Sequence, residues 1–215
     1  MSRNNLNQAT KDFIASLPVP DAPLGAMSLG DFRQLQRDLN VQFSGDIPRD
    51  IETIDQQISG QNAKIHRTQD YNSRTMPTLL YIAGGAFVCS GLDNPAPKKM
   101  ADGAQVIMLG HRLAPEHKIS DSVDDIVNGI IYCLENSAQL NIGENIIIGG
   151  DSSGASFALA AMLNLRDSHP DMLAKIKHMV FISPAVDLSM APQHCREYDE
   201  QDALFSAEAV TAVQT

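Results

Sequence analysis

The chain has 215 residues, with 26 acidic and 16 basic side chains, three cysteines and no tryptophan. That length suits one domain with a hydrophobic core. A content of 43% hydrophobic and 20% charged residues excludes a disordered or fibrous protein. The net charge of −10 argues against nucleic acid or an anionic membrane as a partner, since both require clustered Lys and Arg.

The chain shows no targeting or metal-binding signal. No apolar run approaches the roughly 18 residues of a membrane span, and no signal peptide is visible, so we expect a cytoplasmic protein. The cysteines, Cys89, Cys133 and Cys195, are far apart and lack metal-ligand spacing. We therefore expect neither a metal site nor a disulfide framework.

The first fifty residues are polar and are interrupted by four prolines. Two short amphipathic segments lie within them, at 6–17 and 28–40. In the second, apolar residues recur at spacings of three and four, which predicts a helix resting on an apolar surface, and Ser28 is a plausible start signal. We predict that residues 1–50 form a helical cap or lid and that 51–215 form the core.

From residue 51 onward, strands and helices are predicted to alternate. An early antiparallel pair is expected at 51–58 and 64–69. Four apolar runs then predict strands at 78–83, 105–109, 145–149 and 178–183, and helices are predicted at 96–103, 122–137 and 154–167. Short runs that are apolar on both faces, separated by helices, indicate an α/β fold whose mostly parallel sheet has helices on both faces.

The segment Gly150-Asp-Ser-Ser-Gly154 directly follows an apolar run and opens a predicted helix. This is the G-x-S-x-G pattern in a strand–turn–helix context, where a sharp turn holds the serine oxygen outward. Only Ser152 has glycine at both −2 and +2, so it is the candidate nucleophile and Ser153 is not. The alternative is an ordinary turn rich in glycine and serine.

A second candidate element, Gly84-Gly85, lies just past an earlier predicted strand. Acyl transfer needs backbone N–H donors aimed at the developing oxyanion, and glycines let the backbone approach closely. Gly84 and Gly85 can supply two donors and the Ser153 amide a third. By itself the pair would indicate an ordinary turn at the end of a strand. The serine motif that follows favours the role as an oxyanion donor.

The segment from His111 to His117 is interpreted as structural. We predict that Arg112 and Glu116 form an ion pair that holds a loop after a strand. Neither histidine is expected to be catalytic.

Four segments in order resemble the hormone-sensitive-lipase-like esterases of the α/β-hydrolase fold. They are Ala83-Gly-Gly-Ala-Phe, Arg112-Leu-Ala-Pro-Glu-His, Gly150-Asp-Ser-Ser-Gly and Ser183-Pro-Ala-Val-Asp-Leu. The resemblance runs from about residue 51 to the end, and the N-terminal helices are similar to the family's cap.

The resemblance implies a carboxylic-ester hydrolase (esterase or lipase) that acts on a small ester without a cofactor. Ser152 would attack the ester carbonyl, and the amides of Gly84, Gly85 and Ser153 would form the oxyanion hole. Asp151 is the usual family residue and is interpreted as structural. Two residues depart from the pattern, since the family has histidine at Ala83 and a third glycine at Ala86.

The family's acid and histidine follow its seventh and eighth strands, later than this sequence extends. We therefore expect a hydrolase fold lacking the last two strands and an impaired enzyme, because a serine hydroxyl needs an adjacent base. Asp187 and His194 preserve the order of a triad, but nothing around them indicates a loop that would return to Ser152. The strand at 178–183 is expected to have one unpaired edge.

Three alternatives remain open. In the first, the chain is a non-catalytic hydrolase remnant or acyl-binding module. In the second, it is a subunit that another chain or an oligomer completes. In the third, it is a nucleotide-binding protein. The last is weak, because there is no G-x-G-x-x-G and the serine motif lacks the lysine of a phosphate loop.

Overall fold

The computed structural model describes residues 7–16 and 27–187. The chain divides into two compact units, one of Arg33–Val186 and one of Met1–Phe32 with Asp187–Thr215. The helix α1 (Gln8–Ser16) belongs to the latter. A cap that extends to residue 50 stays a prediction.

The helix α2 (Leu29–Phe43) begins where the sequence predicted a helix. The Ser28 hydroxyl accepts a hydrogen bond from the Asp31 amide at 3.2 Å and donates one to the Asp31 carboxylate at 2.6 Å. The Ser28 side chain thereby satisfies one of the amides that the first turn of a helix leaves without a partner. The predicted start signal is confirmed.

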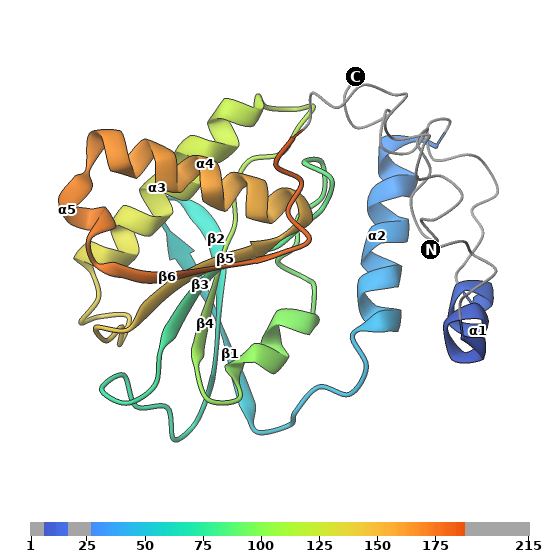
Figure 1. Ribbon diagram of the computed structural model, residues 1–215, viewed down its shortest axis with the longest axis horizontal. Helices are drawn as coiled ribbons and strands as arrows, with labels where there is room; N and C mark the ends of the chain where they lie inside the picture. The colour runs from blue at the N-terminus through green and yellow to red at the C-terminus, as the bar shows by residue number, and fades with distance from the viewer. Residues whose placement is uncertain (1–6, 17–26, 188–215) are drawn as a thin grey trace. The chain divides into compact units, whose positions relative to one another are not determined.

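A six-stranded sheet organises the unit Arg33–Val186, in the order β1-β2-β4-β3-β5-β6 (Figure 1). Its strands are β1 (Ile51–Ile58), β2 (Gln61–Thr68), β3 (Thr78–Ile82), β4 (Gln105–Leu109), β5 (Ile146–Asp151) and β6 (Ile176–Ile182). β2 pairs antiparallel with both β1 and β4, whereas β4, β3, β5 and β6 are parallel. The predicted antiparallel pair and the mostly parallel sheet are confirmed.

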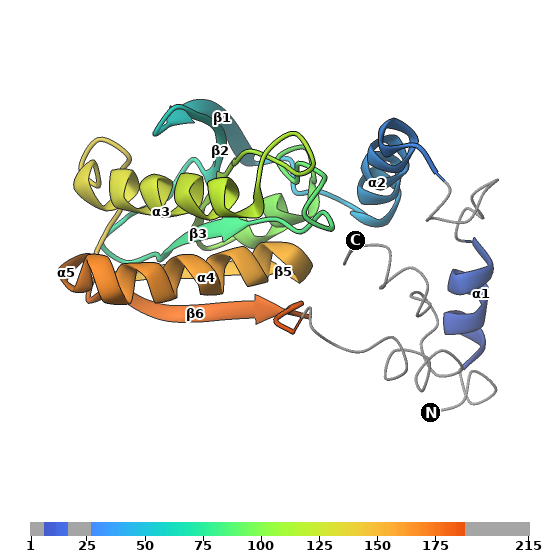
Figure 2. The same cartoon turned by 90° about the horizontal axis from the view of Figure 1, so that it is seen from above.

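Two helices cover one face of this sheet. α3 (Ile119–Glu135) and α4 (Ser152–Ser168) lie side by side along the strands (Figure 2), and the short α5 (Pro170–Leu173) follows α4. Their buried residues, such as Ile130 and Phe157, form one core with Leu80 and Ile107 of the sheet. α3 and α4 correspond to the helices predicted at 122–137 and 154–167.

The opposite face carries a second, smaller core. In β4, Val106 and Met108 point to this face while Ile107 points to the first, so the strand is buried on both sides. Ala101 of the 3₁₀ helix η3 (Ala96–Ala101) packs against them. The helix predicted at 96–103 is therefore a tighter and shorter one.

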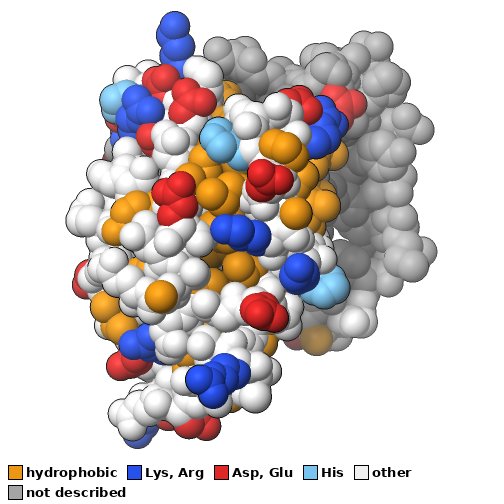
Figure 3. All heavy atoms as spheres, turned by 90° about the vertical axis from the view of Figure 1, so that its left-hand side faces the viewer, with side chains coloured by type: hydrophobic (Ala, Val, Ile, Leu, Met, Phe, Trp, Pro, Cys, Tyr) orange, Lys and Arg blue, Asp and Glu red, His pale blue; other side chains and the backbone are white. Residues whose placement is uncertain are grey.

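Apolar side chains also reach the surface of this unit. Within the described residues β6 pairs with β5 alone, and its Met179, Val180 and Ile182 are 45–54% exposed. Hydrophobic side chains likewise gather between charged ones on the face seen from the α5 side (Figure 3). The unpaired edge predicted for this strand is present in the described sheet.

Candidate active site

The candidate nucleophile lies at the junction of β5 and α4. Asp151 ends the strand, and Ser152 is the first residue of the helix, with φ of +49° and an exposed side chain. A serine rarely adopts this left-handed conformation, because its Cβ crowds the backbone. The strained turn therefore holds the Ser152 side chain away from the sheet, as the G-x-S-x-G pattern predicted.

The two glycines of the motif let the turn pack against the end of β3. A Cβ placed on Gly150 would lie 2.6 Å from the carbonyl oxygen of Ile82. A Cβ on Gly154 would lie 2.7 Å from the carbonyl carbon of Ala83. Both distances are shorter than a normal van der Waals contact, so each position requires glycine.

The loop after β3 brings the other predicted site residues to this turn. A Cβ on Gly84 would lie 2.7 Å from the carbonyl oxygen of Asp151 and 3.0 Å from the Cβ of Ser152, so only glycine lets the loop approach the turn this closely. The Gly85 amide donates to the hydroxyl of Ser153 at 3.0 Å, and Ser153 is 2% exposed. The structure thus places Ser152, Gly84, Gly85 and Ser153 together.

Asp151 connects the same two segments. Its carboxylate accepts hydrogen bonds from the Gly84 amide at 2.9 Å and from the Tyr81 hydroxyl at 2.7 Å. Burial raises the pKa of Tyr81, and the Asp151 carboxylate raises it further, so the hydroxyl stays protonated and remains a donor. These bonds agree with the structural role expected for Asp151.

Two of the three predicted oxyanion donors are therefore already engaged. The Gly84 amide bonds a carboxylate and the Gly85 amide bonds a hydroxyl. The Ala86 amide, by contrast, has no hydrogen-bond partner within the described residues. Ala86 is thus a donor that the sequence analysis did not single out, because such pairing cannot be read from a motif.

The loop carrying these amides has a strained backbone. Ala86 and Phe87 are consecutive non-glycine residues with φ of +51° and +66°. The amides of Val88 and Cys89 both donate to the Gly85 carbonyl oxygen, at 3.0 and 2.8 Å. These two bonds close a tight turn next to the candidate site. The turn forms although Ala86 stands where the family has its third glycine.

The predicted ion pair between Arg112 and Glu116 is wrong. Arg112 instead donates two side-chain bonds, of 2.8 and 2.9 Å, to Asp125 of α3, which is 8% exposed. Glu116 pairs with Arg33 of α2 through two bonds of 2.7 Å, which lower the pKa of its carboxyl to about 2. Residues four apart face each other on a helix, but 112–116 is a turn, so Arg112 and Glu116 reach different elements.

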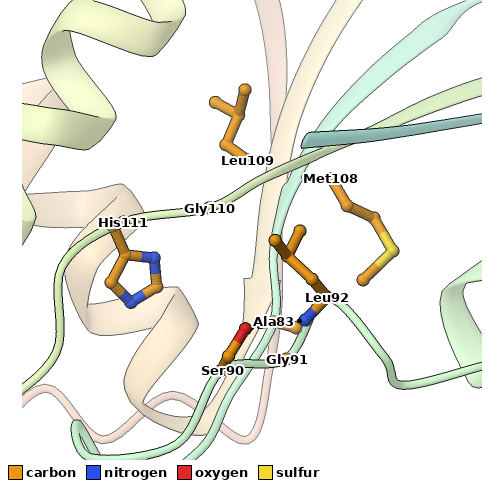
Figure 4. Close-up of a pocket in the computed structure, with 8 residues that line it drawn as sticks. All are labelled: Ala83, Ser90, Gly91, Leu92, Met108, Leu109, Gly110 and His111. Carbon is orange, nitrogen blue, oxygen red and sulfur yellow. Dashed lines mark hydrogen bonds between the residues drawn. The ribbon is translucent and has the colours of Figure 1, made fainter. Parts of the chain in front are cut away.

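His111 is half-buried near this loop. Its ring meets that of Phe157 edge-on at 4.9 Å, and burial lowers its pKa. The Nδ1 atom is buried without a hydrogen-bond partner among the described residues. His111 also lines a cavity of about 10 Å³ with Ala83 and Ser90, which has room for about one water molecule (Figure 4).

Two further catalytic candidates, Asp187 and His194, are not part of the unit Arg33–Val186. Asp187 belongs to the other unit, and His194 lies outside the described residues. In the described part of the chain, no group of three His, Cys, Asp or Glu side chains could hold a metal ion. None of the described helices is long and apolar enough to cross a membrane.

Comparison with known proteins yields related sequences. A family model described as the alpha/beta hydrolase fold matches residues 79–215. An esterase of Acinetobacter venetianus is 34% identical over 139 residues, which are 62% of this chain and 44% of that protein. Esterase LipU of Mycobacterium tuberculosis is 29% identical over 144 residues, or 65% of this chain and 46% of that protein. The chain thus spans about half the length of the curated relatives it matches.

Solved structures agree on the architecture. A hyperthermophilic esterase from the archaeon Pyrobaculum calidifontis has a TM-score of 0.79 at 22% identity, covering 97% of this chain and 69% of that one. A hormone-sensitive lipase from a metagenome library has a TM-score of 0.73 at 22% identity, covering 95% and 67%. At such low identity these structures bear on the fold alone, and the fold class predicted from the sequence is confirmed.

Proposed function

Because the chain belongs to the alpha/beta hydrolase fold family, we propose that it is built for carboxylic-ester hydrolysis with Ser152 as the nucleophile. The observation that carries the proposal is the left-handed Ser152, with φ of +49°, exposed at the start of α4 beside a loop position, Gly84, where a Cβ would meet it at 3.0 Å. Its Oγ would attack the ester carbonyl carbon and expel the alcohol. Water would then hydrolyse the acyl-enzyme and release the acid.

The proposed oxyanion donors differ in how readily they can turn to a substrate. Gly85 donates to the neutral Ser153 hydroxyl, which a negatively charged oxyanion would outcompete as an acceptor. Gly84 donates to the Asp151 carboxylate, a stronger acceptor. We therefore expect the Gly85 and Ser153 amides to receive the developing charge first, with Gly84 contributing least.

We also propose that this chain by itself hydrolyses esters slowly. No hydrogen bond joins a histidine of the described residues to Ser152: His66 bonds Thr53 at 3.0 Å, His169 bonds the adjacent serine at 2.8 Å, and His111 packs its ring on Phe157. A serine hydroxyl without a base is a weak nucleophile at neutral pH. Enzymes that lose their triad retain roughly 10³–10⁴-fold over water.

A non-catalytic acyl-binding remnant is the second candidate. It is favoured by the two side chains that occupy the amides of Gly84 and Gly85, since a resting oxyanion hole would be expected to leave them free. Completion by another chain or by an oligomer also stays a proposal. So do a small ester as the substrate and a cytoplasmic location.

The test is p-nitrophenyl butyrate turnover combined with mass mapping of the acylated residue. We expect a butyryl group on Ser152 and slow steady-state release of p-nitrophenol. Ser152→Ala should lose the adduct. Ser168→Ala, which removes a serine hydroxyl at the other end of the same helix, should keep it.

This assay distinguishes slow hydrolysis through Ser152 from a non-catalytic remnant. No adduct on Ser152, with equal rates for the chain and its Ser152→Ala variant, would favour the non-catalytic remnant. A rate hundreds of times above the variant would contradict slow hydrolysis and show that the chain supplies its own base.

A further inference from the structure

One side chain of α2 reaches two loops of the unit Arg33–Val186. The Nε atom of Arg33 donates to the Val88 carbonyl oxygen at 2.7 Å, and Nη2 donates to the Ala114 carbonyl oxygen at 3.1 Å. Both terminal nitrogens also bond Glu116 at 2.7 Å. One guanidinium group thus holds the loop of Gly84 and Gly85 against the turn at 112–117.

The polar side chains next to Arg33 on the helix form their hydrogen bonds within α2 and not with the loops. Gln34 donates to Asp38 at 2.9 Å and Arg37 donates to Gln34 at 2.6 Å, both within α2. No described residue of α2 is buried. Leu35 and Leu39 of this helix are only half-buried, so polar bonds such as those of Arg33 add to its attachment.

The loop held by Arg33 needs such support. Val88 directly follows the left-handed pair Ala86 and Phe87, and strained conformations persist only where several surrounding contacts fix them. The Ala114 amide donates to the Phe87 carbonyl oxygen at 3.3 Å, so the turn at 112–117 contacts the same strained segment. Arg33 binds both sides of this junction.

We propose that Arg33 is a positioning residue that clamps the loop of Gly84 and Gly85 in the conformation required next to Ser152. The catalytic consequence rests on the function proposed above, whereas the clamp itself does not. Loss of the guanidinium would free the Val88 carbonyl and let the strained pair relax. The Gly85 amide would then move away from the Ser153 hydroxyl and from Ser152.

Cys89 provides a readout that needs no catalysis. It follows Val88 and is 5% exposed, whereas Cys133 in the core of α3 is 0% exposed. Burial raises the pKa of the Cys89 thiol, and the charges of Arg33 and Arg37 partly lower it. Removing either cation therefore makes the thiol intrinsically less reactive, so faster labelling would report greater access to Cys89, and Cys133 distinguishes local opening from general unfolding.

The experiment is peptide-resolved iodoacetamide alkylation of the full chain at pH 8. For Arg33→Ala we expect labelling of Cys89 to accelerate at least about tenfold, because several bonds to a charged group are lost. Arg37→Ala should leave it unchanged or slower. Glu116→Gln, which keeps both bonds from Arg33 to carbonyl oxygens, should change it less than about threefold. Cys133 should stay unlabelled throughout.

Two results would overturn the clamp. One is unchanged labelling of Cys89 in Arg33→Ala. The other is labelling of Cys133 that rises in parallel with Cys89 in both Arg33→Ala and the milder Arg33→Lys, which would show general unfolding. If Cys89 labelling accelerates as expected but Ser152 of the unmodified chain is never acylated, the clamp stands and the proposed hydrolysis fails.

Discussion

Gly154→Ala tests whether the serine turn depends on close contact with the end of β3. A new methyl group would lie 2.7 Å from the carbonyl carbon and 2.8 Å from the carbonyl oxygen of Ala83. The carbonyl oxygen of Ile82 would lie closer still. A normal contact is about 3.5 Å or more, so the backbone must move by more than ~0.8 Å. Overpacking of this kind destabilises by about 1–3 kcal/mol, against a gain of about 0.5–1 kcal/mol from replacing a helical glycine.

The difference is a net loss of about 0–2.5 kcal/mol in the free energy of unfolding. Because the methyl group would meet backbone atoms of both Ile82 and Ala83, we expect a value near the upper end, about 2 kcal/mol. For a chain of this size that corresponds to a fall in Tm of about 4–8 °C, measured by circular dichroism or calorimetry. The matched control is Gly129→Ala in α3, where the methyl group would lie 3.6 Å from Leu109. That variant should raise Tm by about 1–4 °C. If Gly154→Ala raised Tm like its control, the close contact would not exist.

Three further predictions concern single side chains. Burial lowers the pKa of His66 from 6.5 to about 4. Between these two pH values His66 is therefore protonated in the unfolded chain but neutral in the folded one. The free energy of unfolding should fall over that window by up to about 3 kcal/mol, and a urea titration should show a smaller fall in His66→Gln. Tyr81→Phe removes the bond to Asp151 and should destabilise by about 1.5–3 kcal/mol in the same titration at pH 7, while a change below about 0.5 kcal/mol would contradict the bond. Ser153→Ala leaves the Gly85 amide without its acceptor, so hydrogen exchange there should accelerate roughly three- to tenfold, and an unchanged rate would show that the amide is bonded elsewhere.

The strands and the serine turn were predictable because local sequence encodes them. Runs that are apolar on both faces mark buried parallel strands, and glycines two residues either side of Ser152 mark a turn that admits no larger side chain. The interactions of Arg112 were not predictable from neighbouring residues. Its partner Asp125 lies 13 residues away on α3, and only the path of the chain brings the two together.

The hydrogen-bond partners at the site could not be predicted for the same reason. The glycine-rich loop could be recognised as a source of backbone donors, but the occupation of Gly84 and Gly85 by side-chain oxygens depends on the packing of the turn. The bond from Arg33 to Glu116 joins residues 83 positions apart. No periodicity or motif encodes such a contact.

The close approach of Ala83 and Gly91 bears on how this chain can change by mutation. A Cβ on Gly91 would overlap the Cβ of Ala83, and the adjoining cavity of about 10 Å³ is far smaller than an imidazole ring. A histidine at position 83 would therefore displace the backbone around Gly91. The two positions are coupled, so the fold would accept Ala83→His only together with a compensating change nearby. For this loop, the order in which mutations occur decides which of them the fold accepts.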